Sequence, residues 1–599
     1  MKKIHLWLLA LASGLLLAAA WPVNGFTPLI FFALVPLFGA EDFVLRKQKE
    51  YDAAKAQGKT GVKHTRYHVF GYSYLSFAVW NALTTWWIWF STPAAVLAIG
   101  LNALLMAFTF TCFHYTCRHF FKKGSRWIIL FVYWIGFEYF HHNWDVSWPW
   151  LTLGNVFSTR PEWVQWYEIT GVLGGSLWIL ICNAAILRWI GFRKAFLNGL
   201  TSQKSVFNAS MLAAGLIFLP FLASVIRYYT YRPQGKPVEV VVVQPNLDPY
   251  SDQFDLTPRD AARRMLQLAQ SQVSEQTRFI VTPESMLQEN VWEDEMPYCT
   301  SVRMVQHFLK TRPNAQLVAG ISSYSRVPPS DSAMQGVRKF RYTDNPFLKY
   351  YRAHNSVIVI SADAMMPMPI HHKSKLTPGV EIMPFAGKLK FVEKLAIDLG
   401  GTTGTLGIDP GPTVFISDNP LCCRVEGGSY AEHRRAFKPA DTLQRIKFSD
   451  IICYESVFGD YVASCVRAGA ELLFVSTNDG WWGNTPGHRQ HASYARLRAI
   501  ENRRDIARSA NTGISCFIDQ KGKVYQATPY WEPACIKRQL SANRALSPYA
   551  RYGDVLGRCA LPLSLFFLLL TLVYRFFPQA WRNRVKLIRA PSPTPERRD

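Results

Sequence analysis

Long apolar stretches lie at both ends of the chain and are absent from its middle. Eight of them fall at residues 4–21, 25–44, 69–91, 94–115, 127–142, 169–191, 206–228 and 556–576. Stretches of roughly 17–25 apolar residues are long enough for a helix to cross a bilayer. No comparable stretch occurs between residues 236 and 545. The pattern therefore predicts a membrane domain of seven helices over residues 1–235, an extramembrane domain over 236–545, and a membrane helix with a basic tail over 546–599.

Short apolar runs alternate with helical patterns in the middle of the chain. The predicted strands are residues 238–244, 278–281, 316–321, 355–360, 450–452 and 472–476, and the predicted helices are 258–274, 297–310, 459–467 and 491–505. Residues 514–518 and 524–527 predict a hairpin. Strands that alternate with helices before a hairpin indicate an α/β sandwich.

Glycine and proline recur throughout residues 385–445, and this composition predicts turns around one strand. The segment lacks the Gly-Lys-Ser/Thr ending of a phosphate-binding loop. Within it, residues 391–397 have the pattern of an amphipathic lid that touches the bilayer.

Lysine and arginine residues gather in alternate connections between the predicted helices. The basic segments are 46–66, 118–126, 188–204 and 575–589. Basic loops near membrane helices favour the cytoplasmic side, so both termini should be cytoplasmic and residues 236–545 should lie on the opposite face. These loops also account for much of the net charge of +24, so we expect no nucleic-acid partner. The first stretch also fits a cleavable signal peptide, whose removal would leave this orientation unchanged.

Cys453 stands where an apolar strand meets a predicted strand-to-helix turn. Such a turn would expose the sulfur to a substrate near the positive end of a helix, which lowers a thiol pKa. A cysteine in an apolar run is more often a small buried hydrophobic residue. Other candidate catalytic residues elsewhere in the chain favour a catalytic role for Cys453.

Two further groups complete a plausible acyl-transfer site. Glu284 follows the end of a predicted strand, where α/β sheets commonly place catalytic groups. Lys373 follows two histidines, a pattern that also fits a solvated basic loop. A carboxylate base, a thiol nucleophile and an ammonium group that stabilises an oxyanion suffice for acyl transfer through a thioester. Because no C-x-x-C pair or zinc-type His/Cys cluster appears in the sequence, we expect no metal.

Four ordered motifs carry a resemblance to a known family. They are Pro283-Glu284; Lys373-x-x-Leu376-x-Pro378 followed by Glu381; Ile452-Cys453-Tyr454-Glu455; and Asn478-Asp479-x-Trp481-x-Gly483. This order resembles the nitrilase-like (carbon–nitrogen hydrolase) superfamily, whose triad is Glu, Lys and Cys. Membrane helices on both sides of such a domain resemble one branch, the apolipoprotein N-acyltransferases of the bacterial envelope. The implied fold is a polytopic α-helical membrane protein of about eight helices with an α/β nitrilase-like αββα sandwich.

The resemblance implies roles for individual residues. Glu284 matches the general base, Lys373 the oxyanion-stabilising lysine, and Cys453 the acyl-accepting nucleophile. Supporting positions are Glu381 beside the lysine, Tyr454 and Glu455 after the cysteine, and Asn478, Trp481, Trp482 and Gly483 in the loop beside the pocket. No cofactor and no metal are implied.

The chain departs from the family pattern at a few positions. The two residues before Glu381 are Gly-Val where Phe-Gly is expected, and Lys375 stands where the family often has histidine. Lys373 is preferred to Lys375 because it keeps the spacing to Glu381. The aromatic residue expected after the first strand is either Tyr250 or Phe254.

The resemblance implies a two-step reaction at a bacterial inner membrane. Cys453 takes a fatty acyl chain from a membrane phospholipid, and the thioester then passes it to the α-amino group of a diacylglyceryl apolipoprotein. Both substrates are anchored in the bilayer, so a multi-pass monomer with its catalytic domain on the periplasmic face meets them at high effective concentration. The sequence leaves open the preferred phospholipid and lipoproteins, and the state of the outer cysteines.

Two other functions fit parts of the pattern. A membrane-tethered carbon–nitrogen hydrolase, such as an amidase, would use the same triad with water as the acceptor. A lipid transporter or scaffold with an inert nitrilase-like domain would need no triad, whereas all three residues are present in order.

Overall fold

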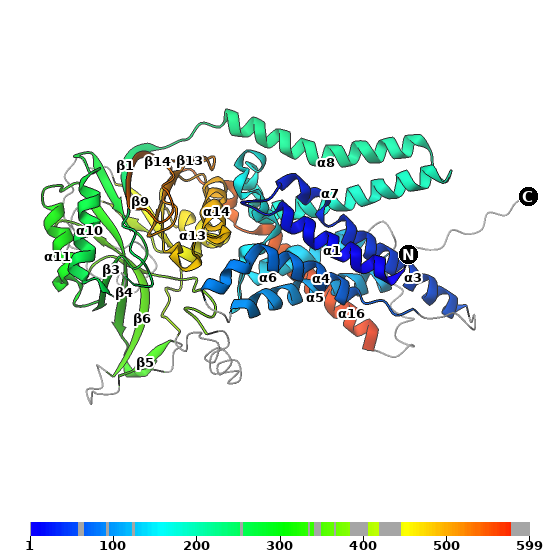
Figure 1. Ribbon diagram of the computed structural model, residues 1–599, viewed down its shortest axis with the longest axis horizontal. Coiled ribbons are helices and arrows are strands. Elements are labelled where there is room, and N and C mark those ends of the chain that lie inside the picture. The colour runs from blue at the N-terminus through cyan, green and yellow to red at the C-terminus, as the bar shows by residue number, and fades with distance from the viewer. Residues whose placement is uncertain are drawn as a thin grey trace, which may run out of the picture.

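The structure is a computed structural model that describes residues 2–57, 65–91, 95–121, 126–251, 255–332, 336–340, 349–363, 367–383, 405–417 and 445–576. A bundle of helices occupies one side of the molecule and an α/β domain the other (Figure 1). The predicted lid at residues 391–397, Phe254 and the basic tail beyond residue 576 lie outside the described residues.

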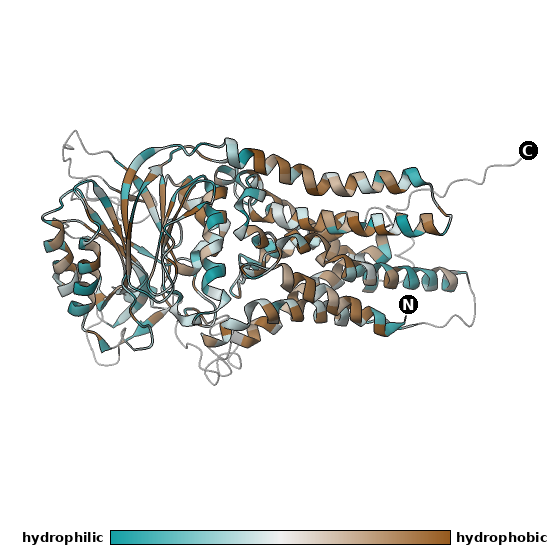
Figure 2. Cartoon of the chain, turned by 45° about the horizontal axis from the view of Figure 1, so that its top comes forward, coloured by the Kyte–Doolittle hydropathy of each residue, from teal (hydrophilic) through white to brown (hydrophobic). Residues whose placement is uncertain are grey.

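The bundle is built from the apolar ends of the sequence. Its helices are α1 (Lys3–Ala20), α2 (Ile30–Ala33), α3 (Val35–Ala56), α4 (Val69–Thr85), α5 (Ala95–Phe120), α6 (Arg126–His141), α7 (Tyr167–Leu197), α8 (Gln203–Thr230) and α16 (Val555–Phe576). Hydrophobic residues dominate these helices in Figure 2, whereas polar residues are more frequent in the α/β domain.

Six segments of the described chain are long and apolar enough to cross a membrane. They are Lys3–Ala20, Thr27–Lys55, Val96–Phe120, Tyr167–Leu197, Gln203–Thr230 and Val555–Phe576. The two remaining predicted spans are also helical, but α4 has 17 residues before it tightens into the 3₁₀ turn Trp86–Phe90, and α6 has 16.

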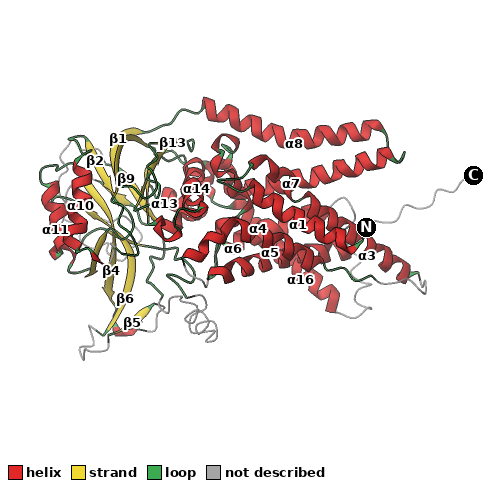
Figure 3. Ribbon diagram, in the orientation of Figure 1, coloured by secondary structure: helices red, strands yellow, loops and turns green. Residues whose placement is uncertain are grey.

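Two sheets form the centre of the α/β domain (Figure 3). In the described residues the first sheet has the order β14-β1-β2-β4-β6-β5, with β3 beside β4 and β7 beside β6, and the second has the order β13-β12-β11-β10-β9-β8. The strands are β1 (Lys236–Gln244), β2 (Thr277–Val281), β3 (Leu287–Trp292), β4 (Gln316–Arg326), β5 (Val337–Lys339), β6 (Tyr350–Ile360), β7 (Ile370–His372), β8 (Phe415–Ile416), β9 (Lys447–Ile452), β10 (Leu472–Thr477), β11 (Ile506–Ala510), β12 (Cys516–Ile518), β13 (Val524–Tyr525) and β14 (Ala534–Ala542).

Helices cover the outer face of each sheet. α10 (Pro258–Gln270) and α11 (Thr300–Leu309) cover the first sheet, while α13 (Gly459–Arg467), α14 (Pro486–Asn502) and the short α15 (Pro548–Tyr552) lie between the second sheet and the bundle (Figure 1). The valine run of β1 shows why these strands are apolar on both sides. Val241 and Val243 belong to the core under α10 and α11, and Val240 and Val242 belong to the core between the sheets. A strand covered on both faces has a continuous rather than an alternating apolar pattern.

The predicted α/β sandwich is confirmed, but several of its elements differ from the prediction, among them the short strands β3, β5 and β7, which were not predicted. The helix predicted over 491–505 starts at Pro486 and ends at Asn502, and the next residues form the strand β11. The sequence also did not predict β14, which pairs antiparallel with β1. Both strands lack an apolar run: β11 contains the buried polar residues Arg508 and Ser509, and β14 contains Lys537, Arg538 and Gln539.

Candidate active site

The first part of the site gathers around a buried lysine at the carboxyl ends of parallel strands. Lys373, which follows β7, places Nζ 3.1 Å from Glu284 Oε1 and 2.8 Å from Glu381 Oε1. Asn355 of β6 donates from Nδ2 to the same two oxygens, at 2.7 and 2.9 Å. The main-chain N–H of Asn478, after β10, donates to Glu284 Oε2 at 3.1 Å. The sequence-predicted Glu284, Lys373, Glu381 and Asn478 therefore lie in one cluster.

Gly320 of β4 allows the Glu284 turn to lie close to the sheet. A Cβ atom at this position would stand 2.4 Å from Ser285 N and 2.6 Å from Pro283 O, closer than real contacts allow. The absence of a side chain at Gly320 thus sets the position of the carboxylate.

Opposite charges favour the ionised forms of Lys373 and Glu381. Burial alone would lower the pKa of Lys373, but the carboxylates of Glu284 and Glu381 outweigh it and raise that pKa well above its ordinary value. Burial likewise opposes ionisation of Glu381, and the Lys373 ammonium nevertheless holds the pKa of that carboxyl below its usual range. A buried ion pair is stable only with this kind of compensation.

Cys453 occupies a sharp turn between β9 and the 3₁₀ helix η9 (Cys453–Val457). Its φ is +48°, a left-handed conformation that costs a non-glycine residue about 1–3 kcal/mol and is frequent at functional sites. Glu455 supports the turn, because its Oε2 accepts a hydrogen bond from Ile452 N at 2.8 Å. Glu455 Oε1 also accepts from Ser374 N at 2.5 Å, so it joins the cysteine turn to the lysine loop.

The predicted lowering of the thiol pKa is wrong. Burial raises the pKa of Cys453 well above its ordinary value, the Glu284 carboxylate raises it further, and Lys373 only partly offsets these effects. The expected helix does not supply compensation, because η9 separates Cys453 from the start of α13 at Gly459. These effects favour the protonated thiol over the thiolate at Cys453.

A buried histidine holds the other side of the cysteine turn. His491 Nε2 lies 3.1 Å from the Cys453 carbonyl oxygen, and its Nδ1 lies 2.8 Å from Asp479 Oδ1. Arg508 Nη2 donates to Asp479 Oδ2 at 2.6 Å, and this charge helps to hold the pKa of Asp479 below its usual range against burial. The sequence assigned no role to His491, Arg508 or Asn355, and their spacing along the chain gives no signal for these contacts.

The solvated-loop interpretation of the two histidines before Lys373 is wrong. His371 is 1% exposed and lies between Asp409 Oδ2, 3.3 Å from Nδ1, and Glu455 Oε2, 3.4 Å from Nε2. Burial would lower the pKa of His371, but these two carboxylates raise it to about 9. His371 faces the cysteine turn because the strand β7 directs neighbouring side chains to opposite faces.

Aromatic residues connect the site to the bundle. The Tyr454 hydroxyl group donates to the Ser147 carbonyl at 2.9 Å, in the loop after α6. The Trp482 ring lies 4.9 Å from that of Trp87 and 5.6 Å from that of Trp150, measured between centroids. Tyr454 and Trp482 thus pack against the membrane domain rather than beside Glu284.

The remaining predicted loop residues lie at the outer rim. The Trp481 ring lies 5.3 Å from that of Tyr250, whose hydroxyl group donates to the Trp481 carbonyl at 3.1 Å. Gly483 directly follows the 3₁₀ helix Asp479–Trp482. A cavity of about 10 Å³ beside Glu284, lined also by Asn478 and Asn511, has room for roughly one water molecule.

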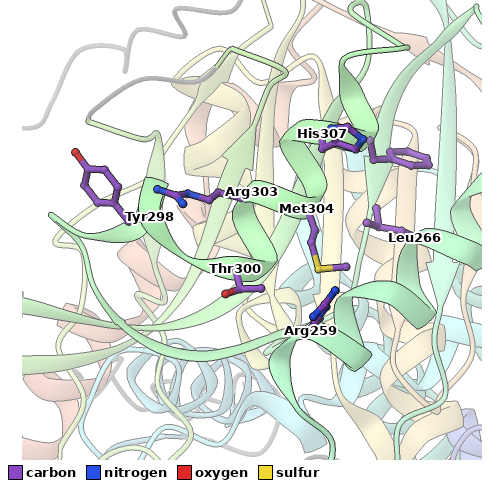
Figure 4. Close-up of a pocket in the computed structure, with 8 residues that line it drawn as sticks. Arg259, Leu266, Tyr298, Thr300, Arg303, Met304 and His307 are labelled. Carbon is purple, nitrogen blue, oxygen red and sulfur yellow. The ribbon is translucent and has the colours of Figure 1, made fainter.

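A larger groove of about 590 Å³ lies away from this site, between α10 and α11. Arg259, Arg303 and Met304 line it, together with His307 and Tyr298 (Figure 4). It is on the side of the α/β domain opposite to the bundle (Figure 1), so it is no part of the Glu284 and Cys453 site.

Comparisons with known proteins match both halves of the chain. A family model described as apolipoprotein N-acyltransferase N-terminal domain matches residues 13–185, and one described as carbon-nitrogen hydrolase matches residues 242–546. The chain belongs to the apolipoprotein N-acyltransferase family. This membership confirms the predicted fold class and makes the chain a bacterial multi-pass inner-membrane N-acyltransferase that acts on lipoproteins.

Relatives in the family align along almost the whole chain. The apolipoprotein N-acyltransferase of Chlorobaculum tepidum is 27% identical over 568 residues, which cover 93% of this chain and 94% of the relative. That of Geobacter metallireducens is 25% identical over 561 residues, 92% of each chain. Among solved structures, Saccharomyces cerevisiae Nit3, of branch 10 of the nitrilase superfamily, is 17% identical, with a TM-score of 0.32 over 52% of this chain and 92% of its own.

Proposed function

We propose that this N-acyltransferase transfers a fatty acyl chain from a membrane phospholipid to the N-terminal amine of a diacylglyceryl apolipoprotein, through a thioester on Cys453. The observation that supports this proposal most strongly is the buried ion cluster of Lys373 with Glu284 and Glu381, whose charges act on a protonated thiol. A neutral thiol is a weak nucleophile, so an adjacent base is needed to form the thiolate during attack.

Glu284 serves as that base in the first step. It takes the Cys453 proton while the sulfur attacks the ester carbonyl of the phospholipid. The ester C–O bond then breaks, the lysophospholipid alkoxide takes the proton from Glu284, and the acyl group stays on the sulfur as a thioester. Three hydrogen-bond donors, from Lys373, Asn355 and Asn478, fix the orientation of the Glu284 carboxylate.

Lys373 stabilises the negative charge that develops on the carbonyl oxygen. Its ammonium group has three N–H donors. Two of them bond Glu284 and Glu381, which leaves one for the oxyanion. One such preorganised donor typically accounts for about 3 kcal/mol of the barrier. Lys375 is less suited, because its ammonium lies over the Phe458 ring, 5.3 Å from the centroid.

In the second step an amine is the nucleophile and the Cys453 sulfur is the leaving group. The amine of the diacylglyceryl-cysteine attacks the thioester and gives its proton to Glu284. The C–S bond breaks as the amide C–N bond forms, and the Cys453 sulfur recovers a proton from Glu284. Exclusion of water protects the thioester between the two steps. Trp482 and Trp150 pack against each other on the side of the bundle, where they can contribute to this exclusion.

The position of the site suits substrates anchored in a bilayer. Tyr454 and Trp482 connect the catalytic domain to loops of the bundle. These contacts hold Cys453 at a fixed position relative to the membrane surface. The basic segments of the chain favour cytoplasmic termini and a periplasmic catalytic domain. We take the active form to be a monomer, because the Glu284, Lys373 and Cys453 groups come from one chain.

The experiment is a reconstituted reaction with a phospholipid carrying a labelled acyl chain and a diacylglyceryl-cysteine peptide. The proposal predicts an N-acylated peptide and an equal amount of lysophospholipid, both absent with Cys453→Ala. A labelled free fatty acid in place of the N-acylated peptide, or ammonia release from soluble amides, would instead support the hydrolase alternative. Movement of lipid between vesicles without bond cleavage would support the transporter alternative.

A further inference from the structure

Three potential metal ligands meet on the outer face of the first sheet, away from Cys453. Glu293 directly follows β3, His354 belongs to β6, and His372 ends β7. One ligand atom of each residue lies within 4.8 Å of the others. His371 and His372 are neighbours, but His371 faces Glu455 and the cysteine turn, whereas His372 faces His354.

The distance between two of these ligands suits a small divalent ion with tetrahedral coordination. Zinc binds imidazole nitrogen at about 2.0–2.1 Å and carboxylate oxygen at about 2.0–2.2 Å, so two tetrahedral ligands lie about 3.4 Å apart. His372 Nε2 and Glu293 Oε1 are 3.4 Å apart. The rings of His354 and His372 stack with centroids 4.0 Å apart, so His354 is the third potential ligand beside this pair.

A serine side chain bonds one ring nitrogen of each imidazole. His354 Nε2 lies 2.7 Å from Ser325 Oγ, and His372 Nδ1 lies 2.9 Å from Ser356 Oγ. In metal sites, the second ring nitrogen of a histidine ligand almost always bonds an outer group, which fixes the tautomer and the ring orientation. Ser323 Oγ donates to Glu293 Oε1 at 3.1 Å and gives the carboxylate a similar support.

His354 is the most constrained member of the cluster. It is 6% exposed, and within the described residues its Nδ1 has no hydrogen-bond partner. The backbone of Gly407 covers the ring, because a Cβ atom there would lie 2.3 Å from His354 Cε1. A buried imidazole nitrogen without a partner is costly unless another group satisfies it.

We propose that Glu293, His354 and His372 bind a divalent transition-metal ion of the zinc type. Two imidazoles and one carboxylate are donors that zinc prefers, whereas calcium and magnesium prefer oxygen ligands alone. Three protein ligands leave a fourth position for water. Such an ion would tie β7 to β3 and β6 immediately before Lys373, and its binding is independent of the acyl-transfer proposal.

The test is zinc binding to the full-length protein, without a histidine tag, in detergent. The protein is stripped with a chelator, and zinc alone is titrated and followed by calorimetry and by metal analysis after dialysis. The wild type should bind one tight equivalent. Glu293→Gln and His372→Gln should weaken that binding at least tenfold, while His307→Gln, an exposed histidine outside the cluster, should bind as the wild type does.

Two controls separate loss of the site from loss of the fold. Glu293 is 27% exposed in its side chain, so Glu293→Gln should leave thermal unfolding in chelator unchanged even if His372→Gln does not. X-ray absorption of the zinc complex should show two imidazole ligands. A wild type that binds no tight equivalent, or a Glu293→Gln variant that binds zinc as tightly as the wild type, would overturn the proposal.

Discussion

The hydroxyl group of Tyr454 donates a hydrogen bond to the main-chain carbonyl of Ser147, 2.9 Å away and 307 positions earlier in the chain. Tyr454 directly follows Cys453, and Ser147 lies in the loop after α6. The turn that carries Cys453 is therefore fastened to the membrane domain by a buried hydrogen bond.

Removal of this bond should loosen the cysteine turn. Tyr454→Phe leaves the buried Ser147 carbonyl without its donor, at a cost of about 1–3 kcal/mol. Tyr250→Phe is the matched control, because the Tyr250 hydroxyl group also donates to a main-chain carbonyl but the residue is 58% exposed. Thermal unfolding in detergent should show a lower midpoint for Tyr454→Phe than for Tyr250→Phe. Equal midpoints would mean that the hydrogen bond to Ser147 does not contribute to thermal stability.

The raised thiol pKa predicts slow alkylation of Cys453 at neutral pH. Because the pKa lies above its ordinary value, the thiolate fraction should keep increasing beyond pH 9, where an unperturbed cysteine with a pKa of about 8.5 is already mostly ionised. The rate of reaction of Cys453 with iodoacetamide, followed by peptide mass spectrometry, should therefore still rise above pH 9. A plateau by about pH 10, where a thiol with a pKa of about 8.5 is almost fully ionised, would contradict the assigned environment.

Glu284→Gln should change alkylation and catalysis in opposite directions. Removal of the carboxylate charge lowers the Cys453 pKa, so iodoacetamide should react faster at pH 8. Acyl transfer should fall by about 10²–10⁴-fold, because general-base catalysis is lost. If both rates fall together, Glu284 supports the structure of the site and does not serve as its base.

Substitutions of the two lysines should separate their roles. Lys373→Met leaves Glu284 and Glu381 buried without a counter-charge, which costs about 3–5 kcal/mol and should abolish acyl transfer. Lys375→Met removes a cation–π contact with Phe458, for which about 1 kcal/mol is expected, and leaves the Glu284 and Glu381 pair with its counter-charge. Thermal unfolding and the rate of phospholipid consumption measure both effects. Loss of activity in Lys375→Met alone would reverse the assignment.

His491 should increase the rate of acyl-enzyme formation by holding the main chain of Cys453 in position. His491→Asn removes the contact with the Cys453 carbonyl, and a hydrogen bond of about 0.5–1.5 kcal/mol predicts a fall of about 2–10-fold in the rate of acyl-enzyme formation. His488→Asn is the control on the same helix, because His488 stacks on Tyr530 instead. A similar rate in both variants would exclude a positioning role for His491.

The strands that precede Glu284 and Cys453 could be placed from local patterns. Each is a short apolar run, and a strand end is a position where side chains from distant segments meet. Lys373 follows two histidines, and only its spacing to Glu381 in the motif singled it out. The order of the four motifs then made the resemblance specific. The cluster of Lys373, Glu284 and Glu381 agrees with that interpretation, although the catalytic roles stay predictions.

Other features depend on contacts between distant segments, and the sequence could not reveal them. β11 was missed because buried Arg508 is neutralised by Asp479, a partner 29 positions away. The predicted direction of the shift in the Cys453 pKa was wrong, because the shift depends on how deeply the turn is buried. The local sequence Cys-Tyr-Glu does not show how deeply a residue is buried. Glu293, His354 and His372 were not recognised as a cluster because they come from three segments that are distant in the sequence.

A thioester on Cys453 can be detected directly by mass spectrometry of the intact protein mixed with phospholipid alone. We expect a mass increase equal to one acyl chain, located on the Cys453 peptide, removed by hydroxylamine and absent in Cys453→Ala. Protein that N-acylates a lipopeptide without ever carrying this adduct, or that carries it in Cys453→Ala, would rule out the thioester on Cys453.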